Sequence, residues 1–434
     1  MFGYRGVKTE VVCKRFMAMP LKKSIKTLRQ TVKYQLNILA DERRLKKLKK
    51  KNKIRVAFFV LHHSVWKCDA VFRAMMEDDF FEPFIFVCPY TGKDDVSCIQ
   101  DVQKNVNFFQ NKGYPTVSSY NKNKSTWIDI DTLDIDIIFF TNPHKITKKD
   151  YYSKAYSKYL SIYIPYSHQI SKYNNYKEQY NQQFHNMMWK IFAPHFDEVD
   201  IFKKNSDLKG RNILVTGYPA TEPLINNELV ANSPWKKQDS NKLRVIFAPH
   251  HTIDTPELPY STFLSFSQQI QSLSEKYKKN IQWAFKPHPM LKEKLYKHKD
   301  WGKEKTDTYY RFWEQSSFSQ LEEGDYYDLF KTSDAMIHDS GSFLAEYLYL
   351  NKPVMYLALS DDIRNYQNPF GNKAYDSCTK GKSYSDIENF LIDLIHHKAP
   401  VDRTFFDNEL AIHFRELTPT MRIMNHLKEE LKNS

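Results

Sequence analysis

The chain has 434 residues with 41% apolar and 15% aromatic side chains, which is long enough for two packed domains. It contains no run of about 18 apolar residues and no secretory-signal pattern, so we expect neither a membrane-spanning segment nor an exported precursor. Its five cysteines are scattered and form no CxxC pair, which favours a reducing compartment and argues against structural zinc.

The net charge of +13 is concentrated in an N-terminal arm, residues 1–53. The arm holds 17 Lys/Arg and 3 Asp/Glu, a net charge of +14, which leaves −1 for the remaining 381 residues. Apolar residues recur in it at roughly helical spacing, namely Leu21, Ile25, Leu28, Val32, Leu36 and Leu39. A basic amphipathic helix is attracted to anionic lipid, so we predict that the arm binds a membrane surface, with a solvated terminal helix as the alternative. Nucleic acid is not expected as a partner, because no RNP-type motif, zinc finger or recognition helix is found.

Residues 54–225 are predicted to form one α/β domain. Its expected strands are continuous apolar runs, as in parallel strands covered on both faces: Ile54–Leu61, Phe84–Cys88, Ile135–Phe140, Leu160–Ile164 and Ile213–Val215. The polar residues 226–241, which include Pro234, are interpreted as an interdomain linker.

Residues 242–400 repeat the pattern, with strands expected at Leu243–Phe247, Ile281–Phe285, Ala335–Ile337 and Val354–Leu357. The tail, 401–434, is expected to be helical, with one apolar face formed by Leu410, His413, Phe414 and Leu417. The predicted fold class is therefore α/β, with two Rossmann-like domains facing a cleft. In such sheets ligands bind outside the carboxyl ends of the strands.

Histidines follow two successive predicted strands of the second domain. His250 and His251 come after the strand at Leu243–Phe247, and Lys286 and His288 come after the strand at Ile281–Phe285. Lysine supplies a charge for phosphate, and imidazoles donate hydrogen bonds to phosphate oxygens or move protons. We therefore predict that these four side chains bind a phosphorylated ligand at the cleft.

A turn of small residues, Asp339, Ser340, Gly341 and Ser342, lies between a predicted strand and a predicted helix. The free N–H groups of a helix N-terminus attract anions, and small residues let an anion approach them. Ser342 and Glu346 share a helix face because they are four residues apart. This layout fits a nucleotide diphosphate, with the pyrophosphate at the turn and the ribose near Glu346. The alternative is an ordinary strand–turn–helix connection capped by serine, which the turn taken alone would favour.

Other chemistries find little support in the sequence. No GxSxG elbow indicates a serine hydrolase, and no GxxxxGK[ST] loop indicates ATP-driven chemistry. The adjacent histidines lack nearby ligands at a recognisable metal spacing, so we expect no metal and no cofactor.

Taken in order, the segments APHHT, FKPHP and YYDLFKTSDAMIHDSGSFLAEYLYLNKPVMYL resemble the CDP-glycerol glycerophosphotransferase family, the teichoic-acid and capsule polymerases and primases of bacterial cell surfaces. The close match covers about residues 242–360. The turn with an acidic residue seven positions on also resembles UDP-N-acetylglucosamine 2-epimerases, which share the GT-B fold. The resemblance implies a GT-B-like architecture and no cofactor.

The resemblance also implies a reaction and roles for residues. An acceptor hydroxyl would attack the β-phosphate of a CDP-alditol, and CMP would leave. Several family members carry W-H-G-T, with a His suggested as base, where this chain has Pro165-Tyr166-Ser167-His168. His168 is the expected general base, with His62, His63 or Tyr166 as alternatives. The donor would contact His250, His251, Lys286, His288, Asp339, Ser340, Gly341, Ser342 and Glu346.

The expected partners are thus a CDP-alditol, a polysaccharide or lipid-linked glycan acceptor, and an anionic membrane surface. The expected location is cytoplasmic, peripheral on the inner face of the bacterial cell membrane. Two alternatives stay open at this point: a GT-B glycosyltransferase or epimerase that uses a nucleotide sugar, and a membrane-tethered binding module without activity.

Overall fold

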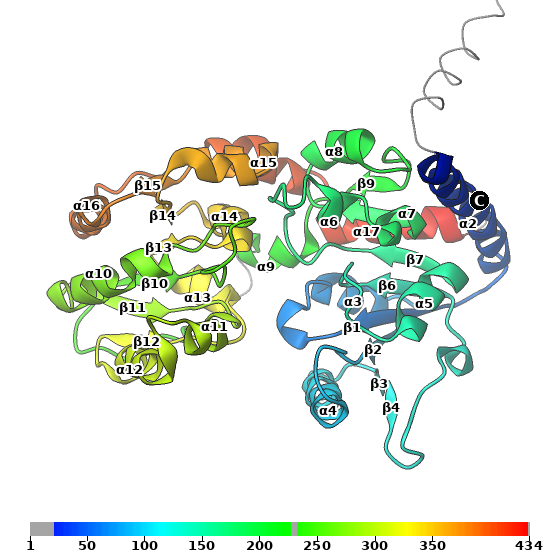
Figure 1. Cartoon of the computed structure of the whole chain (residues 1–434), viewed down its shortest axis with the longest axis horizontal. Coiled ribbons are helices and arrows are strands. Elements are labelled where there is room, and N and C mark those ends of the chain that lie inside the picture. The colour runs from blue at the N-terminus through cyan, green and yellow to red at the C-terminus, as the bar shows by residue number, and fades with distance from the viewer. Residues whose placement is uncertain (1–20, 227–231, 433–434) are drawn as a thin grey trace, which may run out of the picture.

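A computed structural model describes residues 21–226 and 232–432, with side chains from Leu28 onward. The part of the basic arm before residue 21, and residues 227–231 of the expected linker, lie outside this description. Two parallel sheets organise the chain, and we call the parts built on them the first half and the second half (Figure 1). No helix among the described residues is long and apolar enough to cross a membrane.

The first half is built on a seven-stranded parallel sheet in the order β3-β2-β1-β6-β7-β8-β9. Its strands are β1 (Ile54–Val60), β2 (Phe81–Val87), β3 (Thr116–Ser118), β6 (Ile137–Phe140), β7 (Leu160–Tyr163), β8 (Lys190–Ala193) and β9 (Ile213–Val215), and β4 (Tyr120–Asn121) and β5 (Thr126–Trp127) form a separate hairpin. Its helices are α2 (Leu21–Leu48), α3 (Asp69–Met76), α4 (Asp95–Asn111), α5 (Ser153–Lys158), α6 (Lys177–Tyr180), α7 (Gln183–Met187), α8 (Asp197–Asn205) and α9 (Glu222–Ile225).

The second half is built on a six-stranded parallel sheet in the order β12-β11-β10-β13-β14-β15. Its strands are β10 (Leu243–Ala248), β11 (Ile281–Phe285), β12 (Ser319–Leu321), β13 (Ala335–His338), β14 (Val354–Leu357) and β15 (Thr379–Gly381). Its helices are α10 (Phe263–Lys276), α11 (Leu291–Lys297), α12 (Gly302–Gln315), α13 (Tyr327–Thr332), α14 (Gly341–Glu346), α15 (Pro369–Asp376) and α16 (Tyr384–Ile395).

The predicted α/β class and the parallel arrangement are confirmed. Each long apolar run forms a strand, because runs such as Ile54–Val60 are covered on both faces and bury nearly every residue. The structure adds short strands that the sequence did not predict, namely β3, β8, β12 and β15. They are only three or four residues long, and several carry polar residues such as Thr116, Lys190 and Thr379, so they show no continuous apolar run.

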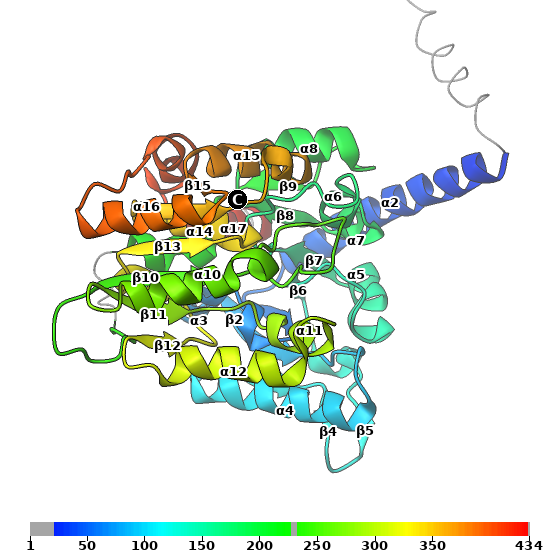
Figure 2. The same cartoon turned by 60° about the vertical axis from the view of Figure 1, so that its left-hand side comes forward.

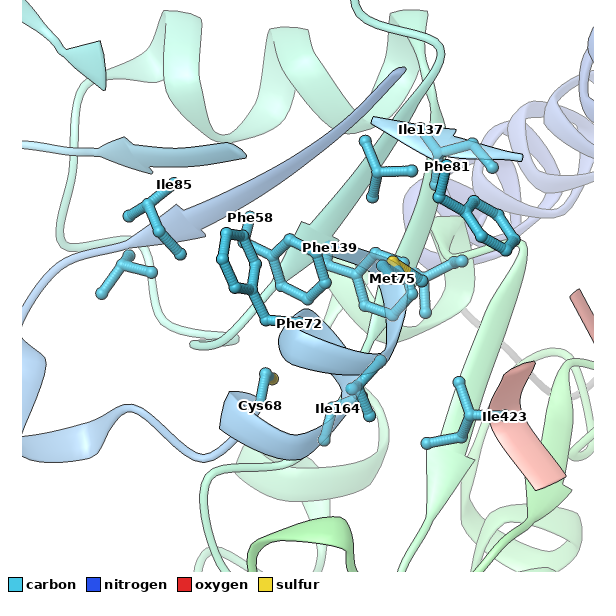
Figure 3. Packing of buried hydrophobic residues seen from close by; sticks show 14 of the residues in the cluster. Phe58, Cys68, Phe72, Met75, Phe81, Ile85, Ile137, Phe139, Ile164 and Ile423 are labelled. Carbon is cyan, nitrogen blue, oxygen red and sulfur yellow. The ribbon is translucent and has the colours of Figure 1, made fainter. Parts of the chain in front are cut away.

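The C-terminal tail returns to the first half. It is less regular than the expected helix up to Phe414, where it forms a π turn and a 3-10 turn, and it then continues as α17 (Pro419–Leu431). Helix α17 packs against α2 and α3, and its Ile423 and Leu427 join the core that contains Phe58 and Phe72 (Figure 3). The two halves are therefore joined by two chain segments, the linker and the tail.

The loops that follow the strands of one sheet contact those of the other. Lys67, beyond β1, donates a hydrogen bond to Tyr326, and Gln169, beyond β7, accepts one from Asn368. Ser171 also forms a β-bridge with Gln367. The carboxyl edges of the two sheets therefore meet, and we call this region the junction (Figures 1 and 2). It is the place where ligands bind in open parallel sheets.

Candidate active site

Three histidine rings of the second half gather at the junction edge of its sheet. The loop after β10 carries His250 and His251, and the turn after β11 carries His288. The ring centroids lie 4.1 Å apart for His251 and His288, 4.5 Å for His250 and His251, and 5.3 Å for His250 and His288. The expected convergence of these residues is thus present in the structure.

The hydrogen bonds of this three-histidine cluster indicate which ring atoms carry protons. The backbone N–H of Met290 donates to His288 Nδ1 at 3.1 Å, so the neutral ring holds its proton on Nε2. Burial and the neighbouring His251 lower the pKa of His288 to about 3, and burial lowers that of His251 to about 4. Neutral rings that present an N–H suit an anion.

A metal ion is the other ligand that this cluster could hold, since one ligand atom from each histidine lies within 4.8 Å of the others. A metal-bound histidine normally donates its other ring N–H to an acceptor. Nδ1 of His288 instead accepts from Met290, which leaves its proton on the atom that a metal would need. The residues present therefore fit an anion better than a metal.

Lys286 lies beside the cluster and is 6% exposed. Its ammonium donates to the carbonyl of Gly324 at 2.7 Å, which uses one of three donors and leaves two for a ligand. Burial lowers its pKa to about 8, against the opposing effect of Glu322 and two further acidic residues. Lys286 therefore still carries a positive charge near neutral pH.

Asp339 does not have the expected position of a donor-binding residue. It is fully buried, and its carboxylate accepts hydrogen bonds from the backbone N–H of His250 and from both the backbone N–H and the hydroxyl of Thr262. Burial raises its pKa to about 7, against these bonds. We correct the expectation: Asp339 positions the His250 loop rather than contacting a ligand.

The turn that follows Asp339 leads into α14 as predicted. Ser340 is the N-cap residue, with extended backbone and no side-chain cap bond, and Gly341 opens the helix. A Cβ at Gly341 would lie 3.4 Å from the Tyr260 ring, in van der Waals contact. Ser342 is partly exposed at the first turn of α14. The helix ends through a 3-10 turn, and Asn351 has a positive φ of 51°.

Glu346 lies at the end of α14 and is 1% exposed. The hydroxyl of Tyr326 donates to its Oε2, and Lys67 of the first half donates to that hydroxyl at 2.6 Å. Its other oxygen, Oε1, is buried without a hydrogen-bond partner among the described residues. Burial raises the pKa of Glu346, against the opposing effect of Lys67. An unpaired buried oxygen is costly, so this carboxylate is suited to accept a ligand hydroxyl.

His168 does not lie where a general base must lie. Its side chain is completely buried, its Nε2 is 3.1 Å from the hydroxyl of Tyr349, and its ring packs against Tyr218 and Phe370. Burial holds its pKa well below the usual value, which makes it a weak base. A base must reach the proton of the acceptor, so we correct the expectation for His168: it joins the two halves by packing.

His62 and His63 follow β1 at the junction edge of the first sheet. Asn105 holds His63 in place by accepting from its backbone N–H at 2.7 Å and pairing with Nδ1 at 2.8 Å, and its ring stacks on Phe108. The described residues give the His62 ring no hydrogen-bond partner. It lies 5.4 Å from the ring of Tyr90, and burial lowers its pKa. Of the two rings, that of His62 is the one that no described side chain holds by a hydrogen bond.

Three residues at the junction, Lys67, Tyr326 and His144, were missed as site candidates. Lys67 and Tyr326 connect the first half to Glu346. His144, beyond β6, has its Nε2 3.3 Å from the hydroxyl of Tyr166, and its Nδ1 3.4 Å from Nε2 of Gln182. His144 carries the same sequence signal as the other histidines, a position just after an apolar strand. The bridges across the junction leave no such signal.

Comparison with known proteins identifies a family whose model matches this chain. The family model described as CDP-Glycerol:Poly(glycerophosphate) glycerophosphotransferase matches residues 165–399, more than half of the chain. That span includes the three-histidine cluster, Lys286 and Glu346. No curated protein matches the chain in sequence.

Solved structures share the fold at low identity. The wall teichoic acid polymerase TagF, as an H444N variant, has a TM-score of 0.56 at 14% identity, and the match covers 94% of this chain and 98% of that one. A Staphylococcus aureus MnaA–UDP structure has a TM-score of 0.53 at 15% identity, covering 88% and 99%. A Neisseria meningitidis UDP-GlcNAc 2-epimerase bound to UDP-GlcNAc has 0.51 at 13%, covering 87% and 100%. These likenesses show the predicted GT-B-like fold.

Proposed function

This chain belongs to the CDP-Glycerol:Poly(glycerophosphate) glycerophosphotransferase family, and on that premise we propose how its residues divide the work of transfer. It is a transferase that moves a glycerol-phosphate-type group from a CDP-activated donor to a hydroxyl of a teichoic-acid-like acceptor. The observation that carries the assignment of residues is the approach of Lys286 and three histidines to one sheet edge, with an unpaired oxygen of Glu346 on α14, the helix that follows the neighbouring strand β13.

The second half binds the donor. Nε2–H of His288, the ring of His250 and the two free donors of Lys286 hold the diphosphate, together with the N–H groups of the turn at 340–342. Oε1 of Glu346 accepts from a ribose hydroxyl. Phosphoryl transfer needs positioning and charge stabilisation more than covalent help, and these groups supply both.

The first half supplies the base. The acceptor oxygen attacks the phosphorus that carries the glycerol, a new P–O bond forms, and the bond to the bridging oxygen breaks so that CMP leaves. His62 takes the acceptor proton. The assignment is supported by the place of His62 just after β1 and by its ring, which lies 5.4 Å from the ring of Tyr90 and has no hydrogen-bond partner among the described residues.

The test is a binding and turnover panel on the full chain. CDP-glycerol, CDP-ribitol, CMP and UDP-sugars are compared by calorimetry, and transfer from CDP-glycerol to a short poly(glycerophosphate) primer is measured directly. We expect cytidine ligands to bind at least about tenfold more tightly than uridine ligands, a difference of about 1.4 kcal/mol. Preference for uridine ligands, or no transfer with any CDP-alditol, would overturn the assignment.

A peripheral location on the inner face of the bacterial membrane is the second part of the proposal. Helix α2 packs on the first half through Tyr34 and Asn37, and the amide of Asn37 donates to the carbonyl of Met187 at 3.1 Å. The opposite side of the helix exposes an apolar stripe: Leu28 (55%), Val32 (49%), Leu36 (62%) and Leu39 (49%). Arginines and lysines flank this stripe, as expected of a helix that lies in an anionic interface.

A further inference from the structure

An unassigned cavity of about 550 Å³ opens on the first half, between α2, α5 and the start of α7. Helices α5 and α7 pack against each other, and α2 packs against α7 (Figure 1). Four lysines from three segments line it: Lys33 of α2, Lys145 and Lys149 of the loop after β6, and Lys154 of α5.

The charged side chains that line this four-lysine pocket are all basic. No Asp or Glu side chain lines it, and of its lysines Lys154 is paired with Asp150 at 2.5 Å. Lys33, Lys145 and Lys149 have no ion pair within the described part of the chain. A second cavity, beside α12, is lined by Lys292 together with several acidic residues. A lining whose charged side chains are all basic therefore distinguishes the four-lysine pocket from this second cavity. Like charges held around one concavity attract a multivalent anion.

Side chains connect the pocket to the junction. Gln182 lines the pocket and lies 3.4 Å from Nδ1 of His144, and Nε2 of His144 lies 3.3 Å from the hydroxyl of Tyr166. Tyr166 belongs to the loop after β7, the same loop whose Gln169 bonds to the second half. An extended anionic chain could thus lie along one edge of the sheet, with one end at the junction and another part in the pocket.

We propose that the four-lysine pocket binds a backbone phosphodiester of the polyanionic acceptor, at a distance from the hydroxyl that reacts. This inference rests on the proposed function, because only an acceptor with phosphates along its chain uses such a site. Tyr152 and Gln182 add an aromatic wall and an amide, which suit the glycerol units between phosphates. Binding energy from a remote part of the substrate then helps to hold the acceptor end in place.

The experiment compares three full-length proteins. The test variant carries Lys145→Gln and Lys149→Gln, which leaves α2 intact, and the control carries Lys278→Gln and Lys279→Gln on the exposed end of the second half. Affinity for a glycerophosphate oligomer is measured over a range of salt, alongside affinity for CDP-glycerol and for phosphatidylglycerol vesicles. We expect the test variant to bind the oligomer about tenfold more weakly with a shallower salt dependence, and the donor unchanged.

The outcomes separate the possibilities. If the test variant binds the oligomer as the control does, while wild type transfers from CDP-glycerol, the pocket assignment is overturned and the proposed function stands. If vesicle binding falls while oligomer binding does not, the phosphate belongs to a lipid headgroup and the acceptor assignment is overturned. If the wild type binds no CDP-glycerol, the fault lies in the proposed function instead.

Discussion

The ammonium of Lys67 donates to the hydroxyl of Tyr326 at 2.6 Å, and this bond joins the first half to the donor side of the second. The ammonium also lies 4.5 Å from the centre of the same ring, and Tyr326 in turn donates to Glu346. The positive charge of Lys67 acts to lower the pKa of both Glu346 and Lys286, so Lys67 interacts electrostatically with both of these donor-site residues. A cation of the first half is thereby linked through Tyr326 to the buried carboxylate of Glu346 in the second.

Loss of Lys67 is expected to weaken productive donor binding. In Lys67→Met the carboxylate of Glu346 loses its nearby positive charge, and a charged hydrogen bond typically contributes about 1.5–3 kcal/mol. We expect kcat/KM for CDP-glycerol to fall about ten- to a hundredfold, with an unchanged melting temperature. Lys276→Met, on α10 and paired with Glu388, is the control and should change kcat/KM less than threefold. If both variants change kcat/KM equally, Lys67 has no specific role in donor binding.

Glu346→Gln is expected to reduce cytidine nucleotide affinity. The amide keeps the shape but weakens acceptance of a ribose hydroxyl, so CMP affinity should fall about tenfold. The control is Glu222→Gln, a carboxylate that already accepts from the backbone N–H of Thr420. Calorimetry with CMP and with 2′-deoxy-CMP is the measurement, and the deoxy ligand should lose little further affinity in Glu346→Gln. An unchanged CMP affinity would refute the ribose role.

The base prediction separates three histidines. His62→Ala should lower kcat by about a hundred- to ten-thousandfold while donor affinity is kept, since that is the usual contribution of a general base. His63→Ala should be milder, because Asn105 and Phe108 already hold that ring. His168→Ala should instead lower the melting temperature, because it opens a hole in a buried aromatic contact. Single-turnover rates on pre-bound donor are the measurement. A His62→Ala enzyme with near wild-type kcat would contradict the base assignment, and the His144–Tyr166 pair would be the next candidate for the general base.

The sequence predicted the main strands and the convergence of the second-half histidines at one sheet edge, because each depends on a local pattern. Long apolar runs such as Ile281–Phe285 form strands, and His250 and His288 follow strands that are hydrogen-bonded neighbours in one parallel sheet. The sequence could not show that the carboxylate of Asp339 accepts hydrogen bonds from Thr262, or that the buried ring of His168 contacts the hydroxyl of Tyr349. Both are contacts between segments that are distant in the sequence. A buried polar residue and a reactive one have the same amino-acid type, so the sequence alone does not distinguish them.

Donor affinity is expected to depend on pH through Lys286. Its pKa in the free protein is about 8, and a bound diphosphate raises it further, so affinity is full below pH 8 and declines as pH rises through the bound-state pKa. Lys286→Arg should remove the decline, because arginine stays charged throughout. The measurement is the Kd for CDP-glycerol from pH 7 to 10. His288→Gln serves as the control: it should weaken binding and keep the alkaline decline. A wild-type affinity that stays flat to pH 10 would contradict this.

Membrane attachment is expected to depend on the outward stripe of α2. Val32→Gln with Leu36→Gln removes two exposed apolar side chains, and burial of one such side chain contributes about 1.5–3 kcal/mol. Binding to phosphatidylglycerol vesicles should therefore fall at least about a hundredfold. The melting temperature should stay within about 2 °C, because neither residue packs on the body. Deletion of the whole arm is a poorer test, since it would also uncover the surface under Tyr34 and Asn37.

The control for α2 is Val96→Gln with Leu264→Gln, two exposed apolar residues on α4 and α10. It should leave vesicle binding within about threefold of wild type, because neither residue lies beside a basic stripe. Added salt should weaken the wild type, since lysines and arginines of α2 contribute through charge, and should weaken the control equally. The measurement is co-sedimentation over a series of lipid concentrations at two ionic strengths. Val32→Gln/Leu36→Gln protein that sediments as well as the control would place the lipid contact elsewhere on the chain.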